Sequence, residues 1–425
     1  MNKYKRYERY KDSGVEWIGE IPEHWNISKL KYLTYCLDEK RIPLSSEQRG
    51  EMQGDIPYWG ANCIIDYVND WIIDGEVVLL GEDGAPFFDR NKDVAFYSNE
   101  KIWPNNHVHV LRALQSINAK LLTYILNTVD YRNYINGSTR DKLTQSEMKN
   151  ILIQLPSAQE QKAIANFLDQ KTAEIDGLIA DKEKLIELLQ EKRQAKITEA
   201  VTKGLNPNVK MKDSGIEWIG EIPEHWDIRR IKYLSNIRNV KASDSDNDKI
   251  YVGLESIEPK TGKLLTNNND EQQAVGETAN IFRKGDVLFG KLRPYLAKCI
   301  VADFNGRCTS ELLVLRTASD MLPEYLYLFM LSPIFIDVVN SSTYGAKMPR
   351  ASWDFIGNLK IPLPNIKEQE EIVEYLIKLT NNMDDLISDI STQIQKLKEY
   401  RQSLISEAVT GKIDVREFGS IREVI

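Results

Sequence analysis

The chain has 425 residues and a formal net charge of −8. This length exceeds what a single core usually organises, so the sequence predicts two to four domains. The acidic balance excludes a protein that binds nucleic acid over its whole surface, and any such binding must be local or shared with a partner.

The amino-terminal stretch MNKYKRYERYKDSG is charged, and no run of about 18 apolar residues occurs in the chain. We therefore expect a cytoplasmic protein with neither a secretory signal nor a membrane span. The cysteines Cys36, Cys63, Cys299 and Cys308 are scattered without CxxC spacing. This argues against a zinc site or a disulfide framework and fits a reducing compartment.

The first motif, DSGVEWIGEIPEHW from Asp12, returns as DSGIEWIGEIPEHW from Asp213 with a single change. Asp-Ser-Gly is typical of a turn, Pro ends regular structure, and the Trp and Ile positions look like anchors. Two interpretations stay open: these anchors pack against helix ends, or two identical surfaces hold two copies of one partner. The residues concerned are Trp17, Ile18, Trp25, Trp218, Ile219 and Trp226.

A variable segment, residues 26–154, follows the first motif and has a mixed α/β pattern. Residues 71–88 and 106–111 are predicted strands, and residues 119–135 are a predicted helix. A polar loop, GSTRDKLTQSEM, then begins at Gly137.

The passage LPSAQEQ from Leu155 opens a long helical segment, and LPNIKEQ from Leu363 opens another. Near the helix ends, EAVTKG from Glu199 is answered by EAVTGK from Glu407. Together with the first motif, these matches indicate a tandem duplication of the chain.

Apolar residues recur at spacings of three and four along both long segments, which is the pattern of a coiled-coil seam. In the second segment the seam is Met383, Ile387, Ile390, Ile394, Leu397, Leu404 and Ala408, with Arg401 interrupting it. In the first segment the corresponding positions are Ile175, Ile179, Lys182, Ile186, Leu189, Arg193, Lys196 and Ala200. A plain amphipathic hairpin explains the pattern about as well. Connectivity requires the pair to be antiparallel, because the second helix must run back toward the first domain.

The second variable segment, residues 227–362, repeats the order of elements with different residues. Residues 284–303 and 312–317 take the strand roles, and residues 323–340 take the helical one. The loop SSTYGAKMPRAS begins at Ser341. The predicted fold class is α/β (α+β), with two mixed α/β domains separated by two long antiparallel helices in a pseudo-twofold arrangement.

The two loops are candidates for nucleic-acid contact. Small hydroxyl residues beside Arg and Lys can meet phosphates, and Arg or Lys can read guanine edges in a major groove. An ordinary polar loop explains the same residues. The stretch GKLRPYLAK, which contains Lys291 and Arg293, is either a phosphate-binding turn or a solvated face.

His107 and His109 alternate on a predicted strand, without an acidic or cysteine partner at ligand spacing. Base contact or ordinary hydrogen bonding is therefore expected there, and no metal site is predicted. The full set of candidate DNA-binding residues is Asn106, His107, His109, Ser138, Thr139, Arg140, Lys142, Lys291, Arg293, Ser342, Thr343, Tyr344, Lys347 and Arg350.

Catalytic motifs are missing from the sequence. There is no GxxxxGK[ST] phosphate loop, no FxGxG or [DNS]PP[YF] pair of an amino-methyltransferase, and no Ser/His/Asp or Cys/His nucleophile set. We therefore predict no catalytic residue. Two other function classes remain as alternatives: a self-contained DNA methyltransferase or nuclease, and a structural adaptor that binds proteins.

The ordered duplication of SGxEWIGEIPEHW, LPxxxEQ with a long helix, and EAVT-G resembles the specificity subunits of type I restriction-modification systems over nearly the whole chain. The resemblance implies a non-catalytic subunit that gives a site-specific endonuclease and adenine methyltransferase complex its DNA specificity. Each variable domain would read one half of a bipartite target, while the helices set the spacer and dock two methylation subunits. Restriction and translocation subunits would join the full complex.

The resemblance also implies that S-adenosylmethionine, ATP and Mg bind partner subunits, with no cofactor in this chain. The implied domains are a repeat motif at 1–25, recognition domain one at 26–154, a central helix at 155–205, the second motif at 206–226, recognition domain two at 227–362, and a carboxy-terminal helix and tail at 363–425.

Overall fold

The computed structural model describes residues 4–135, 141–246, 248–265, 279–345 and 347–418. It divides into two compact units. The first unit comprises Met1–Glu183 and Ser391–Ile425, and the second comprises Lys184–Ile390. Within the described ranges, no helix combines the length and the apolar character that a bilayer crossing needs.

In the first unit the repeated motif folds as a hairpin. Strand β1 (Tyr10–Asp12) pairs antiparallel with β2 (Glu20–Pro22). Gly14 has a φ of 72°, and its amide donates to the Asp12 carboxylate at 2.9 Å, so Asp-Ser-Gly forms the turn that its composition predicts.

The head of the first unit, its globular part outside the long helices, is built on a four-stranded antiparallel sheet in the order β4-β10-β7-β8. A smaller sheet, β6-β5-β9, lies beside it, and β3 pairs with β11, which joins the two ends of the head. The strands are β3 (Asn26–Lys29), β4 (Thr34–Cys36), β5 (Gln53–Trp59), β6 (Ile64–Val68), β7 (Val77–Gly81), β8 (Ala95–Ser98), β9 (Trp103–Pro104), β10 (Val108–Ala113) and β11 (Leu152–Leu155). The helices are α1 (Ser46–Glu51), α2 (Ala119–Leu126) and α3 (Gln145–Asn150), with the 3₁₀ turns η1 (Leu30–Tyr32), η2 (Asp38–Lys40) and η3 (Tyr131–Asn133).

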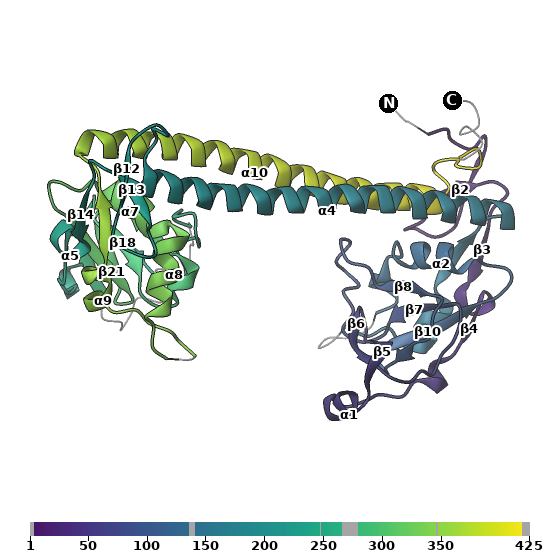
Figure 1. Ribbon diagram of the computed structural model, residues 1–425. Helices are drawn as coiled ribbons and strands as arrows, with labels where there is room; N and C mark the ends of the chain where they lie inside the picture. Colours follow the sequence, from purple (N-terminus) through teal and green to yellow (C-terminus); the bar gives the residue numbers. More distant parts are fainter. Residues whose placement is uncertain (1–3, 136–140, 247, 266–278, 346, 419–425) are drawn as a thin grey trace. The chain divides into compact units, whose positions relative to one another are not determined.

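The core of this head has two faces. Val77, Leu79, Val108 and Val110 form one buried cluster, which Trp59 of the smaller sheet joins. Because side chains alternate along a strand, Val78 and its neighbours lie on the opposite face, where α2 contacts β7, β8 and β10. Figure 1 shows α2 between this sheet and the long helix α4.

The head of the second unit repeats this plan. Its hairpin β12–β13 has the same register as β1–β2, β14 pairs with β22, and the sheets follow the orders β15-β21-β18-β19 and β16-β20-β17. The strands are β12 (Met211–Asp213), β13 (Glu221–Pro223), β14 (Asp227–Arg230), β15 (Ser235–Ile237), β16 (Tyr251–Val252), β17 (Ala279–Phe282), β18 (Val287–Gly290), β19 (Cys299–Val301), β20 (Gly306–Thr309), β21 (Leu312–Thr317) and β22 (Lys360–Leu363). The helices are α5 (Ile231–Leu234), α7 (Pro323–Leu331), α8 (Pro333–Ser341) and α9 (Trp353–Asn358), with the 3₁₀ turns η4 (Asp244–Asp246) and η5 (Pro294–Leu296).

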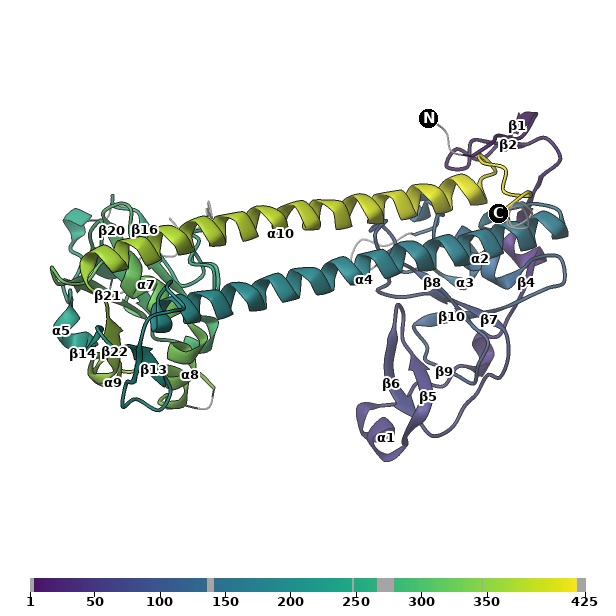
Figure 2. The same cartoon turned by 45° about the horizontal axis from the view of Figure 1, so that its top comes forward.

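The two long helices are α4 (Ala158–Lys203) and α10 (Ile366–Val409). Within each unit they lie side by side in both views (Figures 1 and 2). Seam residues such as Ile175, Ile179, Ile390 and Ile394 are buried, and Leu178 between them is exposed. The predicted coiled-coil seam is confirmed.

The predicted antiparallel direction is confirmed within each unit. In the first unit, Arg401 pairs with Asp176 at 3.0 Å, and Lys182 donates to Gln393 at 2.7 Å, so later residues of α10 meet earlier residues of α4. In the second unit, Arg193 pairs with Asp384, and Gly204 lies close to Glu368.

Some predicted elements differ from the structure. The helix expected over 119–135 ends at Leu126 and is followed by the 3₁₀ turn η3, and the strand expected over 106–111 lies at Val108–Ala113. The strand expected over 71–88 is regular only at Val77–Gly81, because Gly75 and Gly84 adopt left-handed backbone conformations on either side. The strand expected over 284–303 is two strands joined by η5. The helix expected over 323–340 breaks at Ser332, because Pro333 has no amide proton for the helical ladder.

Candidate nucleic-acid interface

The polar loops of the two heads are anchored at equivalent places. In the first head the Leu143 amide donates to the Glu82 carbonyl at 2.8 Å, just beyond β7. In the second head the Ala351 amide donates to the Lys291 carbonyl at 2.9 Å, just beyond β18. Each loop then enters a short helix through a hydroxyl cap, at Thr144 before α3 and at Ser352 before α9. We call the backbone just beyond β7, at Glu82, and just beyond β18, at Lys291, the platform of each head. The platform carries a different loop in each head.

In the first head, Ser138, Thr139 and Arg140 lie outside the described residues. Lys142 is exposed and pairs with Glu82 at 3.3 Å. Asn106 is exposed, while His107 is partly exposed, with its Nδ1 3.4 Å from the Asp83 carboxylate. The segments that carry Lys142 and His107 are both held at the platform. The Glu82 carbonyl accepts from the Leu143 amide, and the Glu82 amide donates to the His107 carbonyl.

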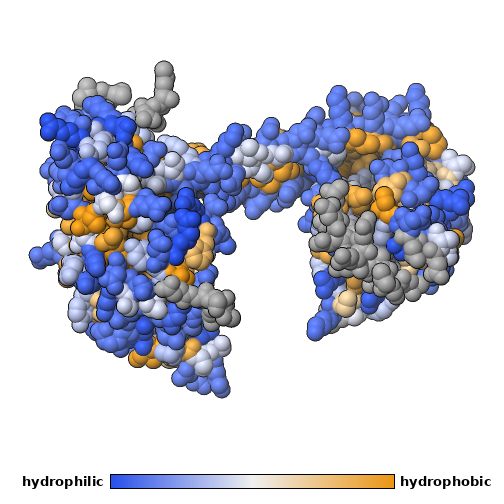
Figure 3. Space-filling model, turned by 180° about the vertical axis from the view of Figure 1, so that it is seen from behind, coloured by the Kyte–Doolittle hydropathy of each residue, from blue (hydrophilic) through white to orange (hydrophobic). Residues whose placement is uncertain are grey.

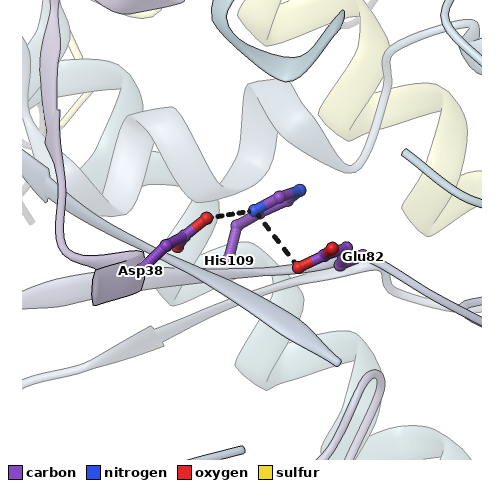
Figure 4. A group of neighbouring side chains, drawn as sticks. All are labelled: Asp38, Glu82 and His109. Atoms are coloured by element: carbon purple, nitrogen blue, oxygen red, sulfur yellow. Dashed lines mark hydrogen bonds and ion pairs between the residues drawn. The ribbon is translucent and has the colours of Figure 1, made fainter. Parts of the chain in front are cut away.

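His109 lies beneath this platform with no exposed surface (Figure 4). Its Nδ1 is 2.7 Å from the Asp38 carboxylate and 3.7 Å from Glu82, and its Nε2 is 2.9 Å from the Leu143 carbonyl. His109 therefore cannot contact a base in this structure, which corrects the prediction made for it.

No acidic residue stands at ligand spacing from His109 in the sequence, but the fold brings Asp38 and Glu82 to it, and the potential ligand atoms of the three residues lie within 4.8 Å of one another. Arg41 already occupies this group, contacting the Glu82 carboxylate and lying 3.5 Å from Asp38. Burial works to raise the pKa of Asp38, but hydrogen bonds from His109 and the Val110 amide, together with the Arg41 charge, lower it to about 2. The group is a charge-compensated support for the segment that leads from the loop into α3.

In the second head the structure brings two predicted stretches together. The Arg293 amide donates to the Pro349 carbonyl at 2.8 Å, and Leu292 forms a β-bridge with Arg350. Arg350 in turn pairs with Glu311 at 3.2 Å. The basic turn after β18 and the loop after α8 thus form one surface.

The predicted residues on this surface differ in exposure and in what they contact. Tyr344 and Lys347 are exposed, Arg293 is exposed with a left-handed φ of 51°, and Lys291 is partly buried. The hydroxyls of Ser342 and Thr343 donate to the Val339 and Asn340 carbonyls, both at 2.7 Å. These two hydroxyls therefore cap the end of α8.

The anchors of the repeated motif face inward. Trp25 and Trp226 have no exposed surface, Ile18 and Ile219 are buried, and Trp17 and Trp218 are partly buried. Gly411, just after α10, lies against Trp25, and Gly204, just after α4, lies against Trp226. This is the arrangement expected of helix-end packing.

Sequence reasoning missed the role of the Glu-Gln pair in LPxxxEQ. His24 and Trp25 contact the Glu160 carboxylate at 2.8 and 3.3 Å, and His225 contacts Glu368 at 3.0 Å. The repeated passages therefore touch each other within each unit. The signal was their joint repetition in both halves.

The adjacent glutamines bridge three backbone groups each. Gln161 accepts from the Asn118 amide at 2.8 Å and donates to the Ser116 and Pro156 carbonyls, both at 3.0 Å. Gln369 makes the same bonds to the Leu322 amide and to the Asp320 and Pro364 carbonyls. The pair thus fastens the start of each long helix to its head.

The structure has two unlike α/β heads on a duplicated helical frame, and each head presents a different polar loop from its platform. These features define a recognition protein with two modules. The family model for the type I restriction modification DNA specificity domain matches residues 22–188 and 223–396. The chain belongs to this family.

Two curated relatives are similar over nearly their full length. The type I restriction enzyme EcoDI specificity subunit of Escherichia coli is 22% identical, over 93% of this chain and 90% of its own. A putative type I restriction enzyme specificity subunit of Haemophilus influenzae is 26% identical, over 92% and 95%. A chain from a solved type I restriction-modification system shares the fold, with a TM-score of 0.65 and 16% identity over 92% of this chain and 98% of that one. The resemblance drawn from the repeated motifs is confirmed.

Proposed function

We propose that this chain gives a type I restriction-modification complex its DNA sequence specificity, with each head reading one half of a bipartite target. The observation that carries this proposal is the shared platform. Both loops begin from the same backbone anchors, yet one carries Lys142 and the other Tyr344, Lys347 and Arg350. Loops that share their backbone anchors but differ in their side chains suit two domains that read two different base sequences.

The chemistry of the exposed loop residues suits duplex DNA. Arg293 and Lys347 are exposed and can contact phosphates or guanine edges, and Tyr344 is 67% exposed beside them. One good bidentate contact discriminates between bases by about 1–3 kcal/mol, so a few per head are enough. Linking two such heads raises the affinity for a target that carries both half-sites.

The long helices act as the spacer in this proposal. Helix α4 is continuous over 46 residues, which corresponds to about 69 Å at 1.5 Å per residue. A continuous helix is stiff compared with a loop, so the gap between half-sites is defined.

The same helices dock two methylation subunits in this proposal. In the second unit, Leu185, Leu188 and Leu386 are 44%, 48% and 46% exposed on otherwise polar helices. Figure 3 shows such apolar side chains among hydrophilic ones along the helices. Exposed leucines on a long helix suit a protein partner.

The partners supply what the chain itself lacks. Methylation subunits that enclose the duplex would neutralise its phosphates, so a chain with a net charge of −8 could take part in DNA binding. S-adenosylmethionine, ATP and Mg bind the methylation and restriction subunits in this proposal, and the chain is their non-catalytic specificity component.

A head exchange tests the proposal. Residues 26–154 are replaced by the corresponding head of another specificity subunit, and methylated positions are mapped in DNA from cells carrying the complete system. We expect one half of the recognition sequence to change and the other half to persist. An unchanged target, or methyl transfer by the purified chain alone, would contradict the proposal.

A further inference from the structure

A buried ion pair joins the two long helices in the second unit. The Arg193 guanidinium of α4 lies 2.6 Å from the Asp384 carboxylate of α10, and the two side chains are 8% and 14% exposed. Arg193 also donates to the Thr261 carbonyl at 3.4 Å, and Lys263 lies 3.1 Å from Asp384. The pair therefore holds both helices and a loop of the second head.

The duplication repeats this pair in the first unit, between Arg401 of α10 and Asp176 of α4 at 3.0 Å. As many residues separate Asp176 from Arg193 as separate Asp384 from Arg401. A single antiparallel register of α4 and α10 therefore satisfies both pairs.

The second head packs on both helices, through Ile197, Ala200 and Val201 of α4 and Ile372 and Leu376 of α10, but the apolar seam by itself does not distinguish that register from its neighbours. Ile and Leu occupy half of the seam positions of α4 and more than half of those of α10, so sliding one helix by a heptad still places many aliphatic side chains opposite each other. The charged seam residues behave differently, because a buried guanidinium without a partner is strongly unfavourable.

Arg193 is the more discriminating of the two arginines. A slide of one heptad in either direction would place it opposite Ile377 or Ser391 in place of Asp384. Arg401 would instead meet Asp169 or Glu183, and its side chain is already 20% exposed. Neither slide places an acidic residue directly opposite Arg193.

We propose that the Arg193–Asp384 pair sets the register of α4 against α10 and thereby the permitted gap between the two half-sites. This inference rests on the proposed function, because it assigns a residue pair to the spacing of the bipartite target. Arg193 and Asp384 are positioning residues, acting on DNA recognition through the helices.

The first test replaces the pair by leucines, Arg193→Leu with Asp384→Leu. Apolar replacement of a buried ion pair usually preserves stability while removing its selectivity for one arrangement. The complex with methylation subunits is given DNA that carries both half-sites at varied gaps. We expect wild type to methylate one gap, and the variant to methylate neighbouring gaps about tenfold more than wild type does.

The matched control replaces an exposed pair between the same helices, Lys398→Leu with Glu183→Leu, whose side chains are 46% and 57% exposed. This control should keep the single gap. Arg193→Lys retains the charge and should also keep it. If the double-leucine chain does not fold, Arg193→Gln with Asp384→Asn carries the same expectation, because it removes both charges and leaves neither one buried without a partner.

A second readout needs no DNA. In a Cys63→Ser chain, Leu189→Cys with Ile387→Cys reports the observed register, and Leu189→Cys with Thr380→Cys reports a slide of one heptad. With Arg193 and Asp384 present, only the first combination should cross-link, and in the double-leucine chain both should. The proposal is overturned if the double-leucine chain forms only the cross-link of the observed register and still methylates DNA with only one gap between the half-sites. If wild type ignores the gap altogether, the proposed function fails, and the cross-links still show whether the pair sets the register.

Discussion

At the scale of single residues, the repeated passages are explained by hydrogen bonds between them. Gln369 has no exposed surface and bridges an amide and two carbonyls at the start of α10. Gln161 does the same at the start of α4. A carboxamide offers both donors and an acceptor, which neither a carboxylate nor an aliphatic side chain can supply.

Replacing Gln369 by Ala should therefore destabilise the second unit. Three backbone groups lose their partner in a buried site, which corresponds to about 2–4 kcal/mol in the free energy of unfolding. Urea denaturation measures the loss. Gln395→Ala is the control, because Gln395 is exposed and its side-chain amide donates to Glu399, one turn along the same helix. Equal effects of the two substitutions would contradict the fastening role.

Asp38 links the stability of the first head to pH. Its folded pKa is about 2, below the ordinary value of 3.8, because hydrogen bonds from His109 and the Val110 amide outweigh burial. A lowered pKa contributes stability above the unfolded value, and that stability is lost as the pH falls from about 4 to about 2.

We expect Asp38→Asn to destabilise the first head by about 2 kcal/mol at neutral pH. Its unfolding free energy should also fall less steeply than that of wild type below about pH 4. Denaturation curves across that range measure both effects. Parallel pH profiles for wild type and variant would show that Asp38 does not provide this linkage.

At the scale of elements, each long helix ends on a glycine that meets a tryptophan of the motif. Gly411 has a φ of 69°, and a Cβ there would lie 2.5 Å from Pro22 and 2.9 Å from Trp25. Gly204 has a φ of 74°, and its nearest neighbour would be Trp226 at 3.2 Å. The repeated EAVT-G passage thus combines a left-handed helix end with close packing.

The two glycines should differ in their tolerance of alanine. Gly411→Ala adds a clash with a rigid ring to the backbone strain, and we expect a loss of about 2–4 kcal/mol in unfolding free energy. Gly204→Ala should cost less, because its contact is longer. Gly14→Ala is the control for strain alone, since its φ is 72° and a Cβ there would have no atom of the described residues within 4 Å; a loss of about 1 kcal/mol is expected. If Gly411→Ala behaves like Gly14→Ala in thermal unfolding, the close packing is not rigid.

The elements that sequence reasoning placed well are those with a strong local pattern. The strand over Leu312–Thr317 was predicted with its observed bounds, and the seam of α10 follows its predicted apolar positions. Short strands such as β9 and β16 carry too few residues for a pattern, and both were missed. The environment of His109 was equally inaccessible, because its partner Asp38 is 71 residues away and only the fold unites them.

At the scale of the whole molecule, the duplication repeats the elements that support the two heads, while the exposed loops of the heads differ. Hairpins repeat with the same register and helix starts with the same glutamine bonds, while the loops on the two platforms share no such identity. A frame that is the same at both ends lets one kind of partner engage each half, and unlike heads let the target be asymmetric. In the proposed function, the helices are the element whose length decides the spacing of the two half-sites.

Lengthening both helices tests this role directly. Seven residues are inserted after Glu183 in α4 and seven after Ile390 in α10, which keeps the seam in phase and leaves both Arg–Asp pairs intact. At 1.5 Å per residue the insertion adds about 10 Å, on the order of three base pairs. We expect methylation mapping to show both half-sites unchanged, with the gap wider by that amount. An insertion in α4 alone puts the pairs out of register and should abolish methylation at a defined gap. An unchanged gap after the double insertion would mean that something other than the helices sets the spacing.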